Sequence, residues 1–215
     1  MKKIVLSQAE IDKLVVVERS VARPTLFKFG INDVGFQVAA DRKPIWQYSL
    51  WKAMLQRAFC QKLKTDKPTY KDVTCCDEWL SFANFLEWVN KEVDYKGKPD
   101  GYQFDKDLII RGNKVYSPEA CSIVPRSINM LLVDSGAIRG EYPMGVCMCK
   151  PTKRFNSYVT INGRTKHLGV FDTPEEAFLA YKVAKEAQIK AVANQYREVL
   201  KPAVYESLVN WGIEP

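Results

Sequence analysis

The sequence lacks several features that would mark a common class of protein. It holds one histidine, His167, in 215 residues. Zinc sites with two histidine ligands are therefore excluded, and a Ser-His-Asp triad would have to use His167. No run approaches the roughly 18 apolar residues that a membrane helix needs. The apolar stretch at the start gives way to Ser7-Gln8-Ala9-Glu10 too early for a signal peptide. We therefore expect a protein that contacts no membrane and works in the cytoplasm.

The six cysteines do not have the spacing of a disulfide framework. Cys75 and Cys76 are adjacent, and Cys147 and Cys149 are two residues apart. Disulfide-rich secreted domains are smaller and richer in cysteine than this chain, so we expect reduced thiols. The four paired cysteines could together hold a zinc ion, although the C-x-x-C spacing of most such sites is absent.

Positive charge is concentrated in two segments of a chain whose net charge is +7. Between residues 145 and 166 there are basic residues and no acidic ones. Between residues 42 and 71 a single acid, Asp66, stands among eight basic residues that alternate with aromatic ones. Such a pattern indicates a polyanionic partner, because each neutralised phosphate releases counterions. A solvated basic face is the alternative. The basic residues of the segment 42–71 are Arg42, Lys43, Lys52, Arg57, Lys62, Lys64, Lys67 and Lys71.

Hydrophobic periodicity and turn residues predict a mixed α+β fold. In the first half we expect helices at about 8–17, 46–60 and 77–90, and the apolar stripe of the last is expected to be core. Residues 102–110 and 114–116 read as two strands of a hairpin around Gly112-Asn113, with a helix starting at Ser117. In the second half we expect a hairpin with an Asn162-Gly163 turn, a helix from Thr173 to about 195 and a last helix at about 202–210. A composition change puts the domain boundary between residues 138 and 139.

The second half resembles the ethylene-response-factor (APETALA) DNA-binding domain. The resemblance rests on Gly145-Val146, on residues 158–163 and on residues 167–177, followed by Ala180-Tyr181 and Ala184-Lys185. It implies three antiparallel strands packed on one helix, with the sheet entering the major groove of double-stranded DNA. We interpret His167 as structural. Strand alternation then predicts the residues that face DNA, which are Lys153, Arg154, Tyr158, Thr160, Arg164 and Lys166.

Residues 46–131 resemble phage-encoded proteins related to HNH homing endonucleases. The resemblance rests on segments such as Phe104-Asp105-Lys106-Asp107 and the stretch from Gly112 to Cys121. It implies a ββα domain that binds one divalent metal ion, with Mg²⁺ expected. Asp105 matches the metal-ligand position, Lys106 stands where the family has a histidine base, and Asn129 matches the last motif position. Ala120 falls where many relatives have a supporting asparagine.

Three hypotheses follow for the first domain. In the first hypothesis the domain is an active nuclease, and Asp107 is a second metal ligand, since strand alternation puts it on the same face as Asp105. The protein would then be a metal-dependent DNA endonuclease, with Arg57 and Lys114 among the residues that contact DNA. The second hypothesis is a nuclease-inactive scaffold that binds DNA as a repressor or recruitment factor. The third is a structural role in which the acids are merely solvated.

Overall fold

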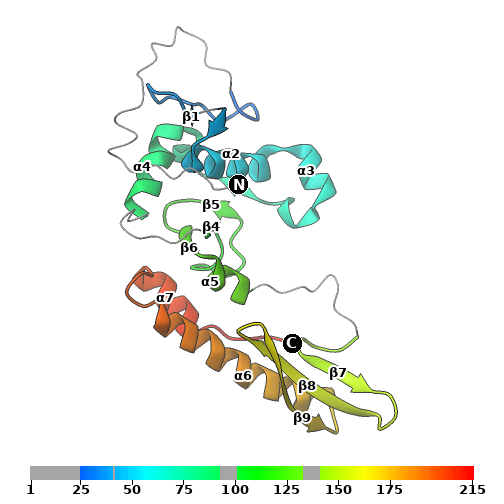
Figure 1. The fold of residues 1–215 in the computed structure, drawn as a ribbon. Coiled ribbons are helices and arrows are strands. Elements are labelled where there is room, and N and C mark those ends of the chain that lie inside the picture. Colours follow the sequence, from blue (N-terminus) through cyan, green and yellow to red (C-terminus); the bar gives the residue numbers. More distant parts are fainter. Residues whose placement is uncertain (1–24, 41, 93–100, 133–140) are drawn as a thin grey trace. The chain divides into compact units, whose positions relative to one another are not determined.

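The computed structural model describes residues 25–40, 42–92, 101–132 and 141–215. The α+β class is confirmed, and the chain divides into two compact units between Pro125 and Arg126 (Figure 1). The helix expected at 8–17 and the boundary expected at 138/139 lie outside the described residues. The unit boundary falls before Arg126 because the following helix packs within the second unit, where Ser127 Oγ donates to Tyr196 Oη at 3.0 Å.

In its described residues, the first unit combines three helices with three pairs of short strands. The pair β4–β6 is antiparallel, β3–β5 is parallel and β1–β2 is antiparallel. Two 3₁₀ turns, η1 (Pro68–Tyr70) and η2 (Asp77–Leu80), connect them. The elements are β1 (Ala39–Ala40), β2 (Lys43–Pro44), α2 (Trp46–Phe59), α3 (Gln61–Asp66), β3 (Thr74–Cys75), α4 (Phe82–Glu92), β4 (Tyr102–Asp105), β5 (Val115–Tyr116) and β6 (Ser122–Pro125).

An aromatic core holds the first unit together. Trp51, Trp79, Phe82 and Phe85 are completely buried, so the apolar stripe predicted for residues 77–90 is confirmed as core. The indole of Trp51 donates to the carbonyl of Trp79 at 2.7 Å. Burial of each large aromatic side chain stabilises the fold by roughly 2–3 kcal/mol.

The helix predicted at 77–90 is interrupted at Ser81. Residues 77–80 form η2, and α4 begins only at Phe82. The break arises because Ile31 pairs with this segment: its N–H donates to Leu80 O, and its carbonyl accepts from Phe82 N. Asp33 then supplies the helix cap, with Oδ1 accepting from the N–H of Ala83 at 2.8 Å. A segment about 50 residues away in sequence therefore sets where α4 starts.

The hairpin predicted between residues 102–110 and 114–116 is wrong. Strand β4 ends at Asp105, because the Asp105 carboxylate accepts the backbone N–H groups of Asp107 and Leu108 and turns the chain. Its partner is β6, in the register Asp105↔Ser122, while β5 pairs with β3. The helix predicted from Ser117 is a turn that leads into β6.

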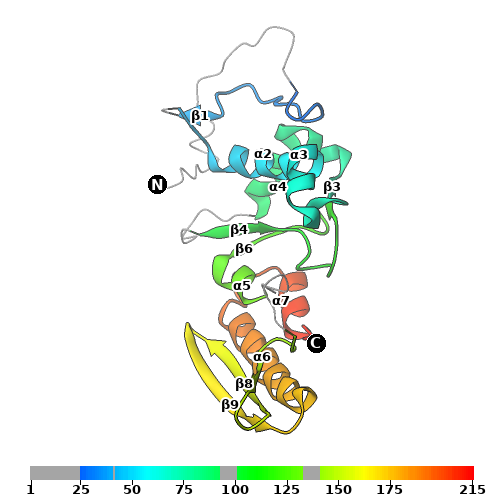
Figure 2. The same ribbon diagram turned by 90° about the vertical axis from the view of Figure 1, so that its right-hand side faces the viewer.

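The second unit is a three-stranded antiparallel sheet packed on one long helix, as predicted. The strand order is β7-β8-β9, and α6 lies along one face (Figure 2). Val159, Phe178 and Tyr181 form the core between sheet and helix. The elements are α5 (Arg126–Leu131), β7 (Val146–Cys149), β8 (Arg154–Ile161), β9 (Arg164–Phe171), α6 (Pro174–Gln195) and α7 (Pro202–Val209).

Local signals fix the ends of these elements. Asn162 and Gly163 have φ of 50° and 74°, as the predicted two-residue turn requires. Thr173 and Glu176 form the predicted capping box at the start of α6. Gly145, at φ 78°, lies so close to the Tyr181 ring that a Cβ could not fit. Within the described ranges, no helix has the length and apolar character to cross a membrane.

Candidate functional site

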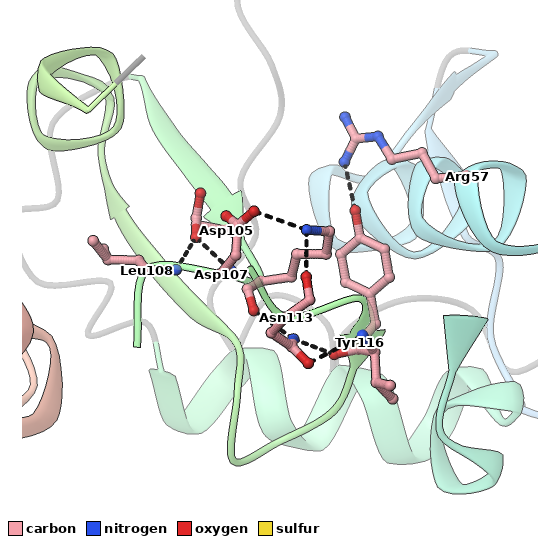
Figure 3. Close-up of polar contacts among 8 residues, drawn as sticks. Arg57, Asp105, Asp107, Leu108, Asn113 and Tyr116 are labelled. Atoms are coloured by element: carbon pink, nitrogen blue, oxygen red, sulfur yellow. Dashed lines mark hydrogen bonds and ion pairs between the residues drawn. The ribbon is translucent and has the colours of Figure 1, made fainter. Parts of the chain in front are cut away.

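The first candidate site is a carboxylate pair at the end of β4 (Figure 3). Asp105 Oδ1 accepts from the N–H of Asp107 at 2.9 Å and from that of Leu108 at 2.7 Å. This turn places the backbone N–H of Asp107 on the Asp105 carboxylate, so the two acidic residues lie next to each other. Asp105 and Asp107 therefore lie close together through a turn, and the strand alternation predicted to bring them to one face is wrong.

The pair is electrostatically costly without a cation. Burial, and then the charge of Asp107, raise the pKa of Asp105 above the usual aspartate range. Two neighbouring carboxylates are stabilised when they share a proton or hold a positive group between them. The arrangement can therefore bind a cation or hold a proton.

Lys106 already provides one positive charge. Its Nζ donates to Asp107 Oδ2 at 2.9 Å and to the carbonyl of Asn113 at 2.8 Å. Its side chain is 12% exposed, whereas that of Asp107 is 45% exposed. Lys106 Nζ is held between a carboxylate and a carbonyl oxygen, so in this geometry Lys106 is a hydrogen-bond donor and an electrostatic partner of the pair.

Asn113 is a functional candidate that sequence reasoning missed. Its Nδ2 donates to Lys106 O at 2.6 Å and to Val115 O at 2.7 Å, and its Oδ1 accepts from Val115 N at 3.1 Å. These bonds tie the loop that follows the carboxylate pair back onto β5. The position expected to carry a supporting asparagine, Ala120, is a buried core residue. The sequence pattern indicates only a turn at Gly112-Asn113 and gives no sign of this role.

Other nearby residues bear on whether a metal ion fits. Ser122 pairs with Asp105 in the β4–β6 register, is 1% exposed, and its Oγ has no partner among the described residues. Asn129 lies in α5, which belongs to the second unit. Across the described parts of the chain, no group of three or more His, Cys, Asp or Glu is arranged to hold a metal ion. All six cysteines are free thiols.

Two tyrosines hold the guanidinium of Arg57. Its Nη1 donates to Tyr116 Oη at 3.3 Å, and its Cζ lies 5.8 Å from the centre of the Tyr70 ring. Burial raises the pKa of Tyr116 to about 12, so its hydroxyl stays neutral. Lys114, by contrast, is exposed beside β5. Of these two DNA-contact candidates, Lys114 is the more accessible.

The second candidate site is the face of the β7–β9 sheet opposite α6. We call it the outer face. Val159 packs against α6 and therefore lies on the helix side of the sheet. Because cross-strand partners share a face and successive residues alternate, the register then assigns every other strand residue to the helix side or to the outer face. The residues of the outer face are Cys147, Cys149, Arg154, Asn156, Tyr158, Thr160, Thr165, His167 and Val170.

A β-bulge moves two predicted DNA-facing residues to the helix side. Ser157 pairs with Gly169, but the next residue, Tyr158, pairs with His167, so Leu168 is the extra residue. Beyond this point every residue of β9 changes face. Arg164 and Lys166 therefore pair with inward-facing residues, although both stay exposed on the edge strand. Gly169 within an otherwise regular strand is the sequence signal for such a bulge.

Polar contacts order the middle of the outer face. Asn156 Oδ1 lies 3.2 Å from His167 Nε2, and the His167 ring lies 5.0 Å from that of Tyr158. The hydroxyls of Thr160 and Thr165 are 3.4 Å apart. His167 therefore has a positioning role, in keeping with its structural interpretation.

The charged groups lie at the ends of the sheet. Lys150 and Lys153 are exposed in the turn between β7 and β8, and Arg164 and Lys166 are exposed next to the turn between β8 and β9. Arg154 is on the outer face, but its Nε donates to Asp172 Oδ1 at 2.8 Å. The outer face is thus uncharged along its middle, and exposed basic residues lie at the two ends of the sheet.

Comparison with protein-family models, with curated proteins and with solved structures finds no match to this chain. The functional argument therefore depends on the two sites themselves.

Proposed function

We propose that the protein binds double-stranded DNA in a sequence-specific manner through the outer face and cleaves it at the Asp105–Asp107 pair. It would be a homing-endonuclease-like phosphodiesterase of phage origin, acting in the cytoplasm of the host cell. The observation that carries the proposal is the exposed outer face, uncharged along its middle, on a sheet with exposed basic residues at both ends.

DNA binding follows from the shape and charge of the sheet. A twisted antiparallel ribbon fits the major groove, where base edges present donors and acceptors. Strand β8 has 8 residues and spans about 25 Å. Its two ends can therefore reach phosphates on either side of a groove about 12 Å wide. Lys153 at one end and Arg164 at the other would contact those phosphates.

The carboxylate pair supports a divalent cation of the Mg²⁺ type. Asp105 and Asp107 offer two carboxylates, and Mg²⁺ is commonly held by one or two carboxylates and several waters. The Ser122 hydroxyl beside Asp105 in the register offers a further oxygen. The donor set contains oxygen only, so it does not fit a structural zinc ion.

Each residue would then have a defined part in hydrolysis. A bound Mg²⁺ would activate water and neutralise charge on the scissile phosphate. Asp105 and Asp107 would hold it, and Asn113 would fix the loop that carries them. Lys106, as an ammonium, would lower the negative potential at the site. The family's histidine base has no counterpart in the first unit, because His167 belongs to the second.

A second function, DNA binding without cleavage, is favoured by the position of Lys106. Its ammonium already neutralises Asp107, which reduces the need for a metal ion at the pair. In that case the first unit would be a degenerate nuclease scaffold, and the protein would act as a repressor or recruitment factor.

A cleavage assay separates these functions. Purified protein would be incubated with phage and bacterial genomic DNA in Mg²⁺ or Mn²⁺, beside an EDTA control, Asp105→Ala and the exposed-acid control Asp72→Asn. Discrete products that EDTA and Asp105→Ala abolish, and Asp72→Asn retains, would support the endonuclease. Intact DNA with a sequence-specific gel shift would support the regulator. If the protein neither cleaved nor bound DNA, both functions would be contradicted.

A further inference from the structure

We infer that the outer face reads A·T base pairs, so that the core of the target site is rich in adenine and thymine. The inference rests on the proposed DNA binding and adds the chemistry of the bases that are read. It depends on which side chains the register brings to the outer face and on how they are held.

The outer face is poorly equipped to read guanine. Guanine is most often read by an arginine or lysine that donates two hydrogen bonds to O6 and N7. Arg154 is the only cationic residue among the nine outer-face positions, all of them described, and its guanidinium is paired with Asp172 at 2.8 Å. Arg164 and Lys166 would serve this role in an unbulged sheet, but the bulge removes them from this face.

Asn156 is positioned to read adenine. An asparagine amide pairs with adenine by accepting from N6 and donating to N7. Asn156 lies on the central strand, and its Oδ1 receives a hydrogen bond from His167 when that ring carries its proton on Nε2. The oxygen keeps its second lone pair and Nδ2 keeps its hydrogens for the base. Contact with Tyr158 holds the His167 ring and therefore fixes the amide.

Methyl groups elsewhere on the outer face complete the preference. Val170 is its cross-strand partner and is 41% exposed. Thr160 and Thr165 form a second pair, two positions further along the strands from Tyr158 and His167. Exposed aliphatic groups and threonine methyls contact the thymine C5-methyl, which no other base carries. An adenine-reading amide next to thymine-contacting methyls selects A·T pairs.

The cations at the ends of the sheet would supply affinity without sequence preference. Lys150, Lys153, Arg164 and Lys166 are all exposed, and contacts to phosphate position a protein without reading bases. Sequence-independent affinity and base preference are therefore carried by different residues. This separation makes the inference testable by substitution.

The test is selection of bound sequences from a randomised duplex library, with the full-length protein in EDTA so that nothing is cut. We expect the selected core to be enriched in A·T pairs. Asn156→Ala should weaken binding to the selected duplex by about 5- to 150-fold and binding to a G·C-rich duplex by less than 2-fold. His167→Ala should lose part of the preference, and His167→Gln, which can still donate to Asn156, should restore it. Lys166→Ala should weaken both duplexes equally.

The outcomes separate the inference from the proposed function. A core enriched in G·C pairs, no enrichment, or equal losses on both duplexes for Asn156→Ala would overturn the inference and leave DNA binding standing. No binding to any duplex would overturn both. Circular dichroism of Asn156→Ala checks that the variant is folded. If it is not, Asn156→Asp, which keeps the shape and removes the donor, should lose the same A·T preference, and an unchanged preference would overturn the inference.

Discussion

Removal of the Asn113 side chain should destabilise the first unit and detach the loop that follows the carboxylate pair. The side chain makes three hydrogen bonds, two to Val115 at the surface and one to the part-buried carbonyl of Lys106. A surface bond contributes about 0.5 kcal/mol and a part-buried one about 1–1.5 kcal/mol. Asn113→Ala should therefore lower the free energy of unfolding by about 2 kcal/mol.

Urea unfolding followed by tryptophan fluorescence measures this effect directly. Four of the five tryptophans, at positions 46, 51, 79 and 88, lie in the first unit, so the signal reports its unfolding. With an m-value of roughly 1.5 kcal/mol/M, the midpoint should fall by about 1 M urea. The control is Lys114→Ala, an exposed neighbour. A loss below about 0.5 kcal/mol for Asn113→Ala, or an equal loss in both variants, would refute the role assigned to Asn113.

Three further predictions concern charge, thiols and the helix cap. Because the folded protein raises the pKa of Asp105, this residue's contribution is most favourable at low pH and is lost as pH rises through the folded pKa. Asp105→Asn should thus be more stable than the wild type at pH 7, with a gain that shrinks near pH 4 in thermal unfolding, and an unchanged gain would argue against the assignment. Hydrogen bonds from Thr152 lower the pKa of Cys149, whereas burial raises that of Cys121. Mass spectrometry after brief iodoacetamide treatment should find Cys149 modified first, and modification of Cys121 first would contradict this. Thr173→Ala removes the capping box of α6 and should cost about 1 kcal/mol in urea unfolding of the second unit, while a cost near zero would mean that the cap is dispensable.

Local signals were sufficient to predict most of the second unit. The Asn162-Gly163 turn, the Thr173 cap and the alternation of β8 each depend on neighbouring residues. The bulge at Leu168 could not be read from alternation, because one extra residue leaves the pattern of each strand segment intact. Only Gly169, at φ 149°, indicates a departure. Alternation along β8 places Tyr158 and Thr160 on the outer face, as the structure does. Alternation along β9 places Arg164 and Lys166 there as well, and the bulge makes this assignment wrong.

The first unit was harder to predict because its pairings are long-range. The strand expected to continue through Asp107 ends at Asp105, where the carboxylate captures two backbone N–H groups. Its true partner, Ser122, follows a turn that resembled a helix start at Ser117-Pro118. Asp105 and Asp107 lie close together through a turn, and the strand alternation predicted to bring them to one face is wrong. The support from Asn113 was not predicted, since it requires knowledge of where the loop folds back.

The central claim, that the outer face binds DNA, is tested most directly by fluorescence anisotropy on a labelled copy of the duplex selected from the library, with two matched double variants. The first, Tyr158→Ala with His167→Ala, alters the outer face. The second, Leu179→Ala with Val183→Ala, alters exposed residues of α6, which packs on the opposite face. We predict at least a tenfold loss of affinity for the first variant and less than a twofold change for the second. Equal affinities, or a greater loss for the α6 variant, would contradict the claim.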